Sequence, residues 1–409
     1  MRCNRQNRCN DSHRESSEAS GKVRFHLPAG AKRSVRFTMC EAYRIAYSRY
    51  FPTSLNTTRG IAMQLREVMS DLRFAAFGAG FWTRFQLNGW REIPGVKCVA
   101  LYNRTLEKAS VYAAEFNIPS VYDNPELLFA NEKLDFVDIV TGPETHEQFA
   151  LLALGHGLPV VCQKPLAPSL DAAERMTRAF EQQGVPLLVN ENWRWQSPIR
   201  QVKHQLENAP IGRPFRARVD MISGFPVFKN QPFLKDLLQF ILTDLGTHIL
   251  DVCRFLFGEV RTVYCKTSKV HAGIAGEDVA TVLLEMTSGV TVVAEMAYAE
   301  NYLEDECFPQ TRIFVEAEHG SLELKSGYRI AVTSKGETRE QIVAPVHYPW
   351  ADPAYDVVHS SIVPCQANLL RALRGEENAE TTAKDNVKTL KLVHASYQSA
   401  QSGQAVPIT

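Results

Sequence analysis

A short apolar run that ends in a glycine turn constrains the fold of this 409-residue chain more than any other feature. Residues 72–77 read LRFAAF and are followed directly by Gly78-Ala79-Gly80. Such a run is typical of a buried strand that enters a tight turn. The first Gly allows the turn, and the second lets a ligand approach the backbone where the next helix begins. The pattern therefore predicts the first strand, turn and helix of an α/β sheet.

The segments that follow alternate between apolar strands and helices. Strands are predicted at residues 96–102, 136–140, 159–162 and 187–189. Helices are predicted at residues 105–116, 145–156 and 169–183, the last with Ser169 as its N-cap and Gly184 just past its end. Alternating strands and helices indicate a parallel sheet, and continuous apolar strands indicate that both of its faces are covered. We therefore expect a Rossmann dinucleotide-binding domain over residues 69–190.

The pattern changes after about Asn190. Several segments now alternate polar and apolar residues, as in an open antiparallel sheet. Strands are predicted at 213–222, 260–269, 279–286, 290–296 and 312–318, and helices at 237–257, 356–373 (interrupted near Pro364) and 383–402. This half is expected to be an α+β domain, residues 191–409, with a largely antiparallel open sheet. Its last helix could pack back on the first domain.

Charge is unevenly distributed, although it sums to zero. Lys+Arg and Asp+Glu each total 45. This balance gives no reason to expect nucleic acid or a membrane as a partner, and the chain has no apolar stretch of about 18 residues that could span a bilayer. Residues 1–68, however, hold 13 Lys or Arg against 5 Asp or Glu. With few apolar residues and no periodicity, this segment is expected to be a disordered basic extension.

Four interpretations of the extension are open. Asp11, Glu15 and Glu18 argue against a transit peptide, and no apolar region supports a secretory signal. A basic arm for a nucleic acid or a partner is the second interpretation, and a solvated tail without a role is the third. We favour the fourth, a gene model that starts too early, because Met69 immediately precedes the first predicted strand.

Cysteine and histidine spacing gives no indication of a metal site. The 9 cysteines include no Cys-x-x-Cys pair, which argues against a zinc site or a redox pair. Scattered cysteines of this kind fit the reducing cytoplasm. His271, His319 and His359 form no ligand-spaced set with carboxylates, so we expect no metal.

The glycine turn is the first candidate binding site. Its strand–turn–helix context is the one that a dinucleotide pyrophosphate needs. Thr83 stands where the third glycine of the fingerprint is expected, so helix–strand packing should differ slightly there. The residues expected to contact the cofactor at this turn are Gly78, Ala79, Gly80, Phe81 and Trp82.

Two later strand ends should also meet the cofactor. Where an acidic residue would favour NAD, the chain has Asn103 and Arg104. Arg104 could pair with a 2′-phosphate, so NADP is favoured over NAD. Thr141, Pro143 and His146 follow another strand end and could border the cofactor, although His146 also suits the first turn of a helix without a functional role.

Two further groups could carry chemistry. Gln163 and Lys164 follow the strand at 159–162, at the end where an α/β sheet places ligands. Asp244 and His248 lie four residues apart on a predicted helix, hence on one face. Such a pair suits a general base with a positioning carboxylate. Taken alone, such a lysine is more often a solvated charge, and such a histidine is more often capped or paired at the surface.

Together these residues give the chain a resemblance to the Gfo/Idh/MocA family of nicotinamide-dependent oxidoreductases, from about Leu72 to the C-terminus. The family's Glu-Lys-Pro motif is matched by Gln163-Lys164-Pro165, and its Asp-x-x-x-His motif by Asp244 and His248. Further similarity lies in the Gly78 and Gly80 turn, the crossover residues 192–195 with Pro198, Ile211 and Gly212, and the closing helix 385–402.

The resemblance implies hydride transfer at C4 of the nicotinamide with a sugar, polyol or related hydroxy or keto compound as the substrate. It implies that His248 deprotonates the substrate hydroxyl and that Lys164 stabilises the charge on the reacting oxygen. Asp244 would orient His248 or contact a neighbouring hydroxyl. A homodimer or homotetramer, formed through the open faces of the antiparallel sheets, is also implied.

Other residues carry weaker expectations. Gln163 replaces the family's Glu, which removes a charge near the nicotinamide ribose. Arg194 could anchor a substrate hydroxyl or carboxylate. Trp193 and Trp195 could stack on a sugar face or belong to the core between the domains.

Two other functions fit the same fold. One is a non-catalytic NAD(P)-binding regulator, because a fold does not fix a function. The other is a hydrolase or epimerase that uses tightly bound NAD for a transient oxidation. The intact set of Lys164, Asp244 and His248 favours an oxidoreductase over the regulator.

Overall fold

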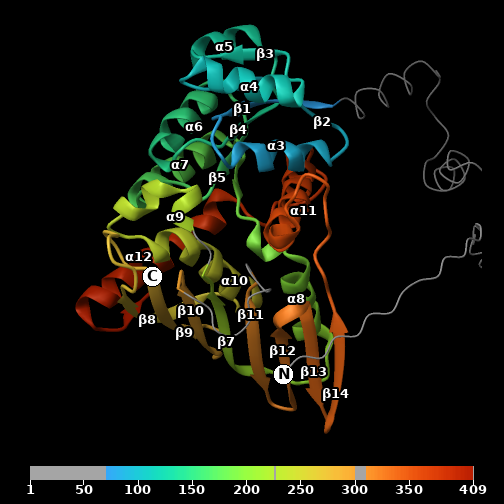
Figure 1. Cartoon of the computed structure of the whole chain (residues 1–409), viewed down its shortest axis with the longest axis vertical. Coiled ribbons are helices and arrows are strands. Elements are labelled where there is room, and N and C mark those ends of the chain that lie inside the picture. The colour runs from blue at the N-terminus through green and yellow to red at the C-terminus, as the bar shows by residue number, and fades with distance from the viewer. Residues whose placement is uncertain (1–70, 225–226, 300–309, 409) are drawn as a thin grey trace, which may run out of the picture. The chain divides into compact units, whose positions relative to one another are not determined.

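The computed structural model describes residues 71–224, 227–299 and 310–408, which form two β-sheets with their helices (Figure 1). The expectations for residues 1–68 and for Met69 lie outside the described residues. Among the described helices, none is long and apolar enough to cross a membrane.

The first sheet has 6 parallel strands in the order β3-β2-β1-β4-β5-β6. This is the strand order of the dinucleotide-binding doubly wound fold, so the predicted fold class is confirmed. Only β3 was missed, because three half-buried residues carry no periodic signal. The strands are β1 (Leu72–Phe77), β2 (Val96–Tyr102), β3 (Ser120–Tyr122), β4 (Phe136–Ile139), β5 (Val160–Gln163) and β6 (Leu187–Asn190).

Helices cover both faces of this sheet, which is why its strands are apolar throughout. Phe74 and Phe136 pack on one face with Trp90, and Phe77 and Phe149 pack on the other. The predicted helix signals are confirmed at α7, where the Ser169 hydroxyl caps the first turn and Gly184 ends the helix in the left-handed region. The helices are α3 (Thr83–Arg91), α4 (Leu106–Phe116), α5 (Pro125–Asn131), α6 (His146–Gly155) and α7 (Leu170–Gln183).

The second sheet has 9 strands in the order β14-β13-β12-β11-β7-β10-β9-β8-β15. Every pairing is antiparallel except β7 with β10, so the sheet is largely antiparallel as predicted. Strands β12, β13, β14 and β15 were missed; the exposed polar residues of β14 show no alternation. The strands are β7 (Pro214–Ile222), β8 (Val260–Ser268), β9 (Val279–Met286), β10 (Thr291–Ala297), β11 (Arg312–Ala317), β12 (Gly320–Lys325), β13 (Arg329–Ser334), β14 (Glu337–Ile342) and β15 (Val406–Pro407).

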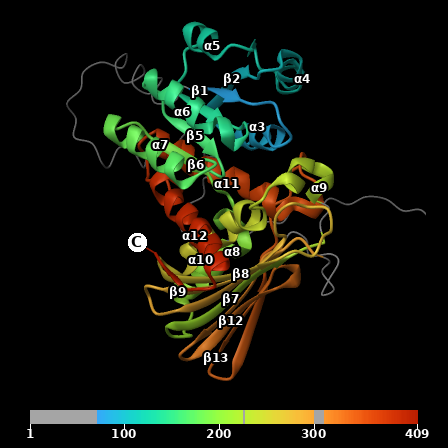
Figure 2. The same ribbon diagram turned by 90° about the vertical axis from the view of Figure 1, so that its left-hand side faces the viewer.

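Three helices, α8 (Ser197–Asn208), α10 (Thr247–Phe257) and α12 (Ala383–Ser402), lie on one face of the second sheet (Figure 2). Helix α12 also packs against α7 and β6, and Leu390 joins the core on one face of the first sheet. The remaining short elements are α9 (Val227–Asn230), η1 (Pro143–Thr145), η2 (Trp193–Trp195), η3 (Pro232–Asp236), η5 (Ser326–Tyr328) and η6 (Pro353–Tyr355).

The helix expected from residue 237 begins later than predicted. Phe240 donates its backbone N–H to Oε1 of Glu277, and Ile241 donates to the Glu277 carbonyl. These bonds satisfy donors of the first turn and fix where the helix starts. The helix then opens with a π-helical turn, η4 (Leu242–Gly246), before α10. Such wider turns occur frequently at functional sites, and this one contains Asp244.

Helix α11 (Asp356–Leu373) runs through Pro364 without the predicted interruption. It packs closely against α3 because Gly89 has no side chain; a Cβ at Gly89 would overlap Ile362 and Gln366. Burial along this contact offsets the one helical hydrogen bond that proline cannot donate.

Candidate active site

Lys164 and Asp244 meet between the two sheets. Lys164 follows β5, and its Nζ donates to Oδ1 of Asp244 at 3.2 Å and to the Asp244 carbonyl at 3.3 Å. The hydroxyl of Tyr298 donates to Oδ2 of the same carboxylate at 3.1 Å. The side chains of Lys164 and Asp244 remain 19% and 17% exposed. The structure thus joins two of the predicted residues into one accessible cluster, and adds Tyr298.

His248 lies on the first turn of α10 and is paired with a residue that the sequence did not indicate. Its Nδ1 is 2.6 Å from Oε1 of the fully buried Glu191. The indole of Trp193 stacks on the imidazole, with 4.6 Å between ring centroids and 9° between planes. Asp244, which was expected to orient His248 or to contact a neighbouring hydroxyl, is bonded to Lys164 and Tyr298.

The local electrostatics favour a neutral histidine. Burial lowers the pKa of His248 well below its usual value, and the positive charge of Lys164 lowers it further. Burial raises the pKa of Glu191 to about 7. Burial raises the pKa of Asp244, but Lys164, His248 and Tyr298 together outweigh burial and hold this pKa below its usual range. At neutral pH the site therefore combines an unprotonated imidazole with an ammonium–carboxylate pair.

The two positions of the glycine turn require glycine for different reasons. Gly78 has φ of +115°, and a Cβ there would lie 2.9 Å from the Val140 carbonyl oxygen. Around Gly80, in contrast, a Cβ would meet nothing within 4 Å. Thr83, in place of a third glycine, fastens the turn: its hydroxyl accepts from the Gly80 N–H and donates to the Gly78 carbonyl, both at 3.1 Å.

The other predicted cofactor residues of this region surround the turn. The Asn103 amide oxygen accepts the N–H of Ala79 at 3.1 Å, so Asn103 ties the end of β2 to the turn. Arg104 is exposed beside it. Phe81 is 52% exposed, whereas Trp82 packs on the ring of Phe85.

Three features fit a bound dinucleotide. Helix α3 has no side-chain cap at its N-terminus, and the N-terminal end of a helix favours an anionic group. The space beside Gly80 lets a pyrophosphate approach the backbone. Gln163, at the end of β5, holds a buried Nε2 that has no partner within the described residues and can donate to a ligand.

His146 lies in a position that differs from the expectation. Its ring is fully buried, with Nε2 3.0 Å from the carbonyl oxygen of Thr141 and Nδ1 3.1 Å from that of Pro165. Both nitrogens face backbone, so His146 joins the end of β4 to the Lys164-Pro165 turn, which argues against direct cofactor contact. Thr141 and Pro143 follow β4 and are half-buried.

Arg194 and Trp195 have partners other than Lys164 and Asp244. The Arg194 guanidinium donates to Asp251 at 2.5 and 2.8 Å and to Asp385 at 2.8 Å. Its donors are committed within the protein because a buried charge needs partners, which argues against the predicted substrate contact. Trp195 is 8% exposed and packs under Arg200, at 4.4 Å, so it takes the core alternative.

Two functional candidates were missed from the sequence, Glu191 and Tyr298. Glu191 directly follows β6, which ends at the same edge as β5, so its position beyond a strand end was an available signal. Tyr298 follows β10, and no local pattern marks it.

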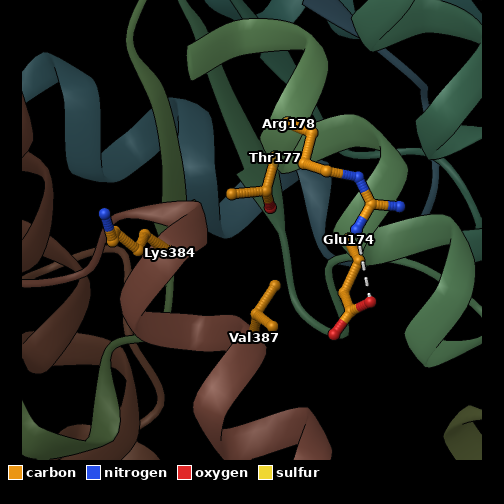
Figure 3. Close-up of a pocket in the computed structure, with 5 residues that line it drawn as sticks. All are labelled: Glu174, Thr177, Arg178, Lys384 and Val387. Atoms are coloured by element: carbon orange, nitrogen blue, oxygen red, sulfur yellow. Dashed lines mark hydrogen bonds and ion pairs between the residues drawn. The ribbon is translucent and has the colours of Figure 1, made fainter. Parts of the chain in front are cut away.

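A surface hollow elsewhere is unrelated to this cluster. It lies between α7 and α12, where Glu174 and Arg178 form an ion pair (Figure 3). No group of three or more metal-ligating side chains occurs in the part of the chain that the structure describes. The residues that line the hollow are Glu174, Thr177, Arg178, Lys384 and Val387.

Comparison with known families assigns both halves of the chain. Residues 72–191 match the family model described as "Oxidoreductase family, NAD-binding Rossmann fold", and residues 199–323 match the "GFO/IDH/MocA C-terminal domain". The chain belongs to the GFO/IDH/MocA oxidoreductase family. Its glycine turn therefore lies in an NAD-binding domain, and the resemblance seen in the sequence is confirmed.

Individual family members extend the match over most of the chain. A D-apiose dehydrogenase of Paraburkholderia graminis is 41% identical over 334 residues, which cover 82% of this chain and 89% of that protein. A D-apiose dehydrogenase of Rhizobium rhizogenes is 37% identical, over 83% of this chain and 98% of its own length. The solved structure of an oxidoreductase from Agrobacterium radiobacter, in complex with NAD+, L-tartaric acid and magnesium, has a TM-score of 0.81 at 36% identity and covers 83% of this chain and 99% of its own.

The open space at Gly80 gives a direct test of nucleotide binding. We expect Gly80→Ala to fold normally but to place a methyl group where the pyrophosphate approaches. A steric cost of about 1–3 kcal/mol corresponds to roughly five- to hundredfold weaker binding. Fluorescence titration with NADH and NADPH measures the change. Gly155→Ala on α6, where a Cβ also meets nothing within 4 Å, is the matched control, and equal affinities in both variants would contradict the placement.

Proposed function

We propose that this oxidoreductase oxidises a CH–OH group of a sugar or polyol, or reduces the corresponding carbonyl, with His248 as the general base. The observation that carries the proposal is the contact of Lys164 with Asp244, one helical turn before the buried His248. Burial, and then the charge of Lys164, lower the pKa of His248. The relatives named D-apiose dehydrogenase support a sugar as the substrate class. Asp244 and Tyr298 are then available to contact a neighbouring substrate hydroxyl.

His248 and Lys164 have different roles in the proposed oxidation. The nicotinamide, when bound, supplies the acceptor for a hydride. His248 takes the proton of the substrate hydroxyl at Nε2, while the two electrons of the C–H bond leave with the hydride and the O–H electrons form the carbonyl. The Lys164 ammonium stabilises the developing negative charge on the reacting oxygen. The substrate is oxidised by two electrons, and the reverse sequence reduces a carbonyl.

We also propose NADP as the preferred cofactor, on account of Arg104. We expect Arg104→Ala to weaken NADPH binding roughly 10- to 100-fold, as loss of a charged hydrogen bond of about 1.5–3 kcal/mol implies, and to leave NADH binding nearly unchanged. Titration of both cofactors measures the ratio. Arg178→Ala, at the unrelated surface hollow, is the control. Equal losses for the two cofactors, or none, would remove the case for NADP.

Absorbance of the reduced nicotinamide tests the proposed function. The full-length protein is assayed with NAD and with NADP against a panel of sugars and polyols, beside His248→Ala. A signal that the variant loses supports the dehydrogenase and names its substrate class. If no substrate in the panel changes the absorbance although the cofactor binds, a regulator is favoured, or an enzyme that keeps its cofactor through a transient oxidation.

Association of identical chains is a further part of the proposal. The face of the second sheet opposite α8, α10 and α12 carries Leu283 and Phe314, which are 42% and 40% exposed. Apolar side chains on an open sheet favour pairing of such faces, and hence a homodimer or homotetramer.

A further inference from the structure

Glu191 is a buried carboxylate to which the mechanism above gives no role. It follows β6 and has 0% exposure. Its Oε1 accepts the backbone N–H of Trp193 at 3.1 Å and lies 2.6 Å from Nδ1 of His248. Its Oε2 has no partner within the described residues. Two acceptor atoms cannot share a hydrogen bond without a proton, so a contact this short places a proton between the carboxylate and the ring.

The surroundings hold both partners in place. The Glu191 N–H donates to the Val189 carbonyl at 2.9 Å, and the Glu191 carbonyl accepts from Sγ of Cys365 at 3.6 Å. The stacked indole of Trp193 fixes the plane of the His248 ring. The other ring nitrogen, Nε2, makes no hydrogen bond to any described residue and is the atom left for the substrate.

We propose that Glu191 is the positioning residue of His248: it accepts the Nδ1–H bond, keeps Nε2 unprotonated, and stabilises the imidazolium that forms during the reaction. This inference rests on the proposed function, because it takes His248 as the base. The substrate proton moves to Nε2, the Nδ1 proton stays on the ring, and Glu191 remains a carboxylate. The arrangement follows the general rule that a buried carboxylate on Nδ1 fixes the tautomer of a catalytic histidine.

Charged groups from several elements act on the pair. A positive charge next to His248 disfavours the imidazolium, and a negative charge favours it. Among the described residues, the Glu191 carboxylate is the negative group that contacts the ring. The groups that face the pair are Lys164 after β5, Asp244 on η4, Asp251 on α10, Arg194 on η2 and Asp385 on α12.

The tautomer can be read without any assay of activity. In full-length protein with ¹⁵N-labelled histidine, we expect the His248 signals, assigned by their loss in His248→Ala, to show a protonated Nδ1 and an unprotonated Nε2 at neutral pH. Glu191→Leu removes the acceptor at similar volume, and we expect the Nε2–H tautomer to appear. A wild-type His248 with its proton on Nε2 would overturn the proposal, even if Glu191→Leu does not fold.

Kinetics supply the second readout. We expect kcat to fall about 10²-fold in Glu191→Leu with little change in KM, at the lower end of what general-base catalysis contributes. Glu191→Gln keeps an acceptor but removes the charge, so the pKa of His248 should fall and the acid limb of kcat/KM should move to lower pH. Asp138→Asn is the control, because Asp138 is also fully buried and hydrogen-bonded, to Trp90 and Asn190, but lies within the first sheet.

The outcomes separate this inference from the proposed function. Suppose that both Glu191 variants keep the pH profile and the tautomer of the unmodified protein, and that His248→Ala is inactive. This result would overturn the role of Glu191 but would still support the proposed dehydrogenase. Full activity in His248→Ala would overturn the base assignment itself, whatever tautomer the ring shows. A shift in thermal stability alone, equal to that of Asp138→Asn, would show Glu191 to be structural and would also overturn the proposal.

Discussion

Replacing His248 by Ala is expected to lower kcat by about 10²–10⁴-fold, which is the range that a positioned general base contributes. The imidazole is neutral at neutral pH because burial and Lys164 lower its pKa, so it is ready to accept a proton from a substrate hydroxyl. Its partners Glu191 and Trp193 hold the ring, and neither belongs to the glycine turn. Cofactor affinity should therefore stay close to that of the unmodified protein.

Turnover at saturating cofactor, together with NADH and NADPH titrations, measures both parts of this prediction. His248→Gln fills more of the volume that the imidazole leaves. It therefore shows whether a fall in turnover comes from the lost base or only from the cavity that Ala creates. His204→Ala, an exposed histidine on α8, is the matched control. Unchanged turnover in both His248 variants would contradict the assignment of His248 as the general base.

The second large effect is expected from Lys164→Met, which keeps the length of the side chain but removes its charge. Loss of one donor to a developing oxyanion typically costs about 10²–10³-fold in kcat. The variant should also change the pH dependence. Without the positive charge the pKa of His248 rises, so the histidine becomes protonated at higher pH and the acid limb of kcat/KM moves upward.

This shift is opposite in sign to the one expected for Glu191→Gln, which makes the pair of variants informative. A pH series of kcat/KM for both proteins measures it, with thermal unfolding as a check on stability. Lys384→Met is the control, because Lys384 is 76% exposed and pairs only with the surface residue Glu181 among the described residues. If the Lys164→Met profile keeps the acid limb of the unmodified protein, Lys164 does not act on His248 as proposed.

Local sequence patterns were enough to predict much of the fold. The strand–turn–helix at Gly78, the Ser169 cap and the apolar strands each depend on neighbours within a few residues, and all three were confirmed. Two helix predictions were wrong where a distant contact intervened. The carbonyl and carboxylate of Glu277 set the start of the helix that contains Asp244, and packing against α3 keeps α11 continuous through Pro364.

The sequence by itself determined the fold class and the chemical groups of the candidate site: Lys164 at a strand end, and Asp244 and His248 on one helical stretch. Tertiary structure decided how those groups are paired. In the folded protein His248 contacts Glu191, and Asp244 is hydrogen-bonded to Lys164 and Tyr298. The Arg194 guanidinium donates to Asp251 and Asp385. The reason is physical: periodicity shows which side chains face a core, but a buried charge is matched by whichever partner the packing of the two sheets brings within hydrogen-bond distance.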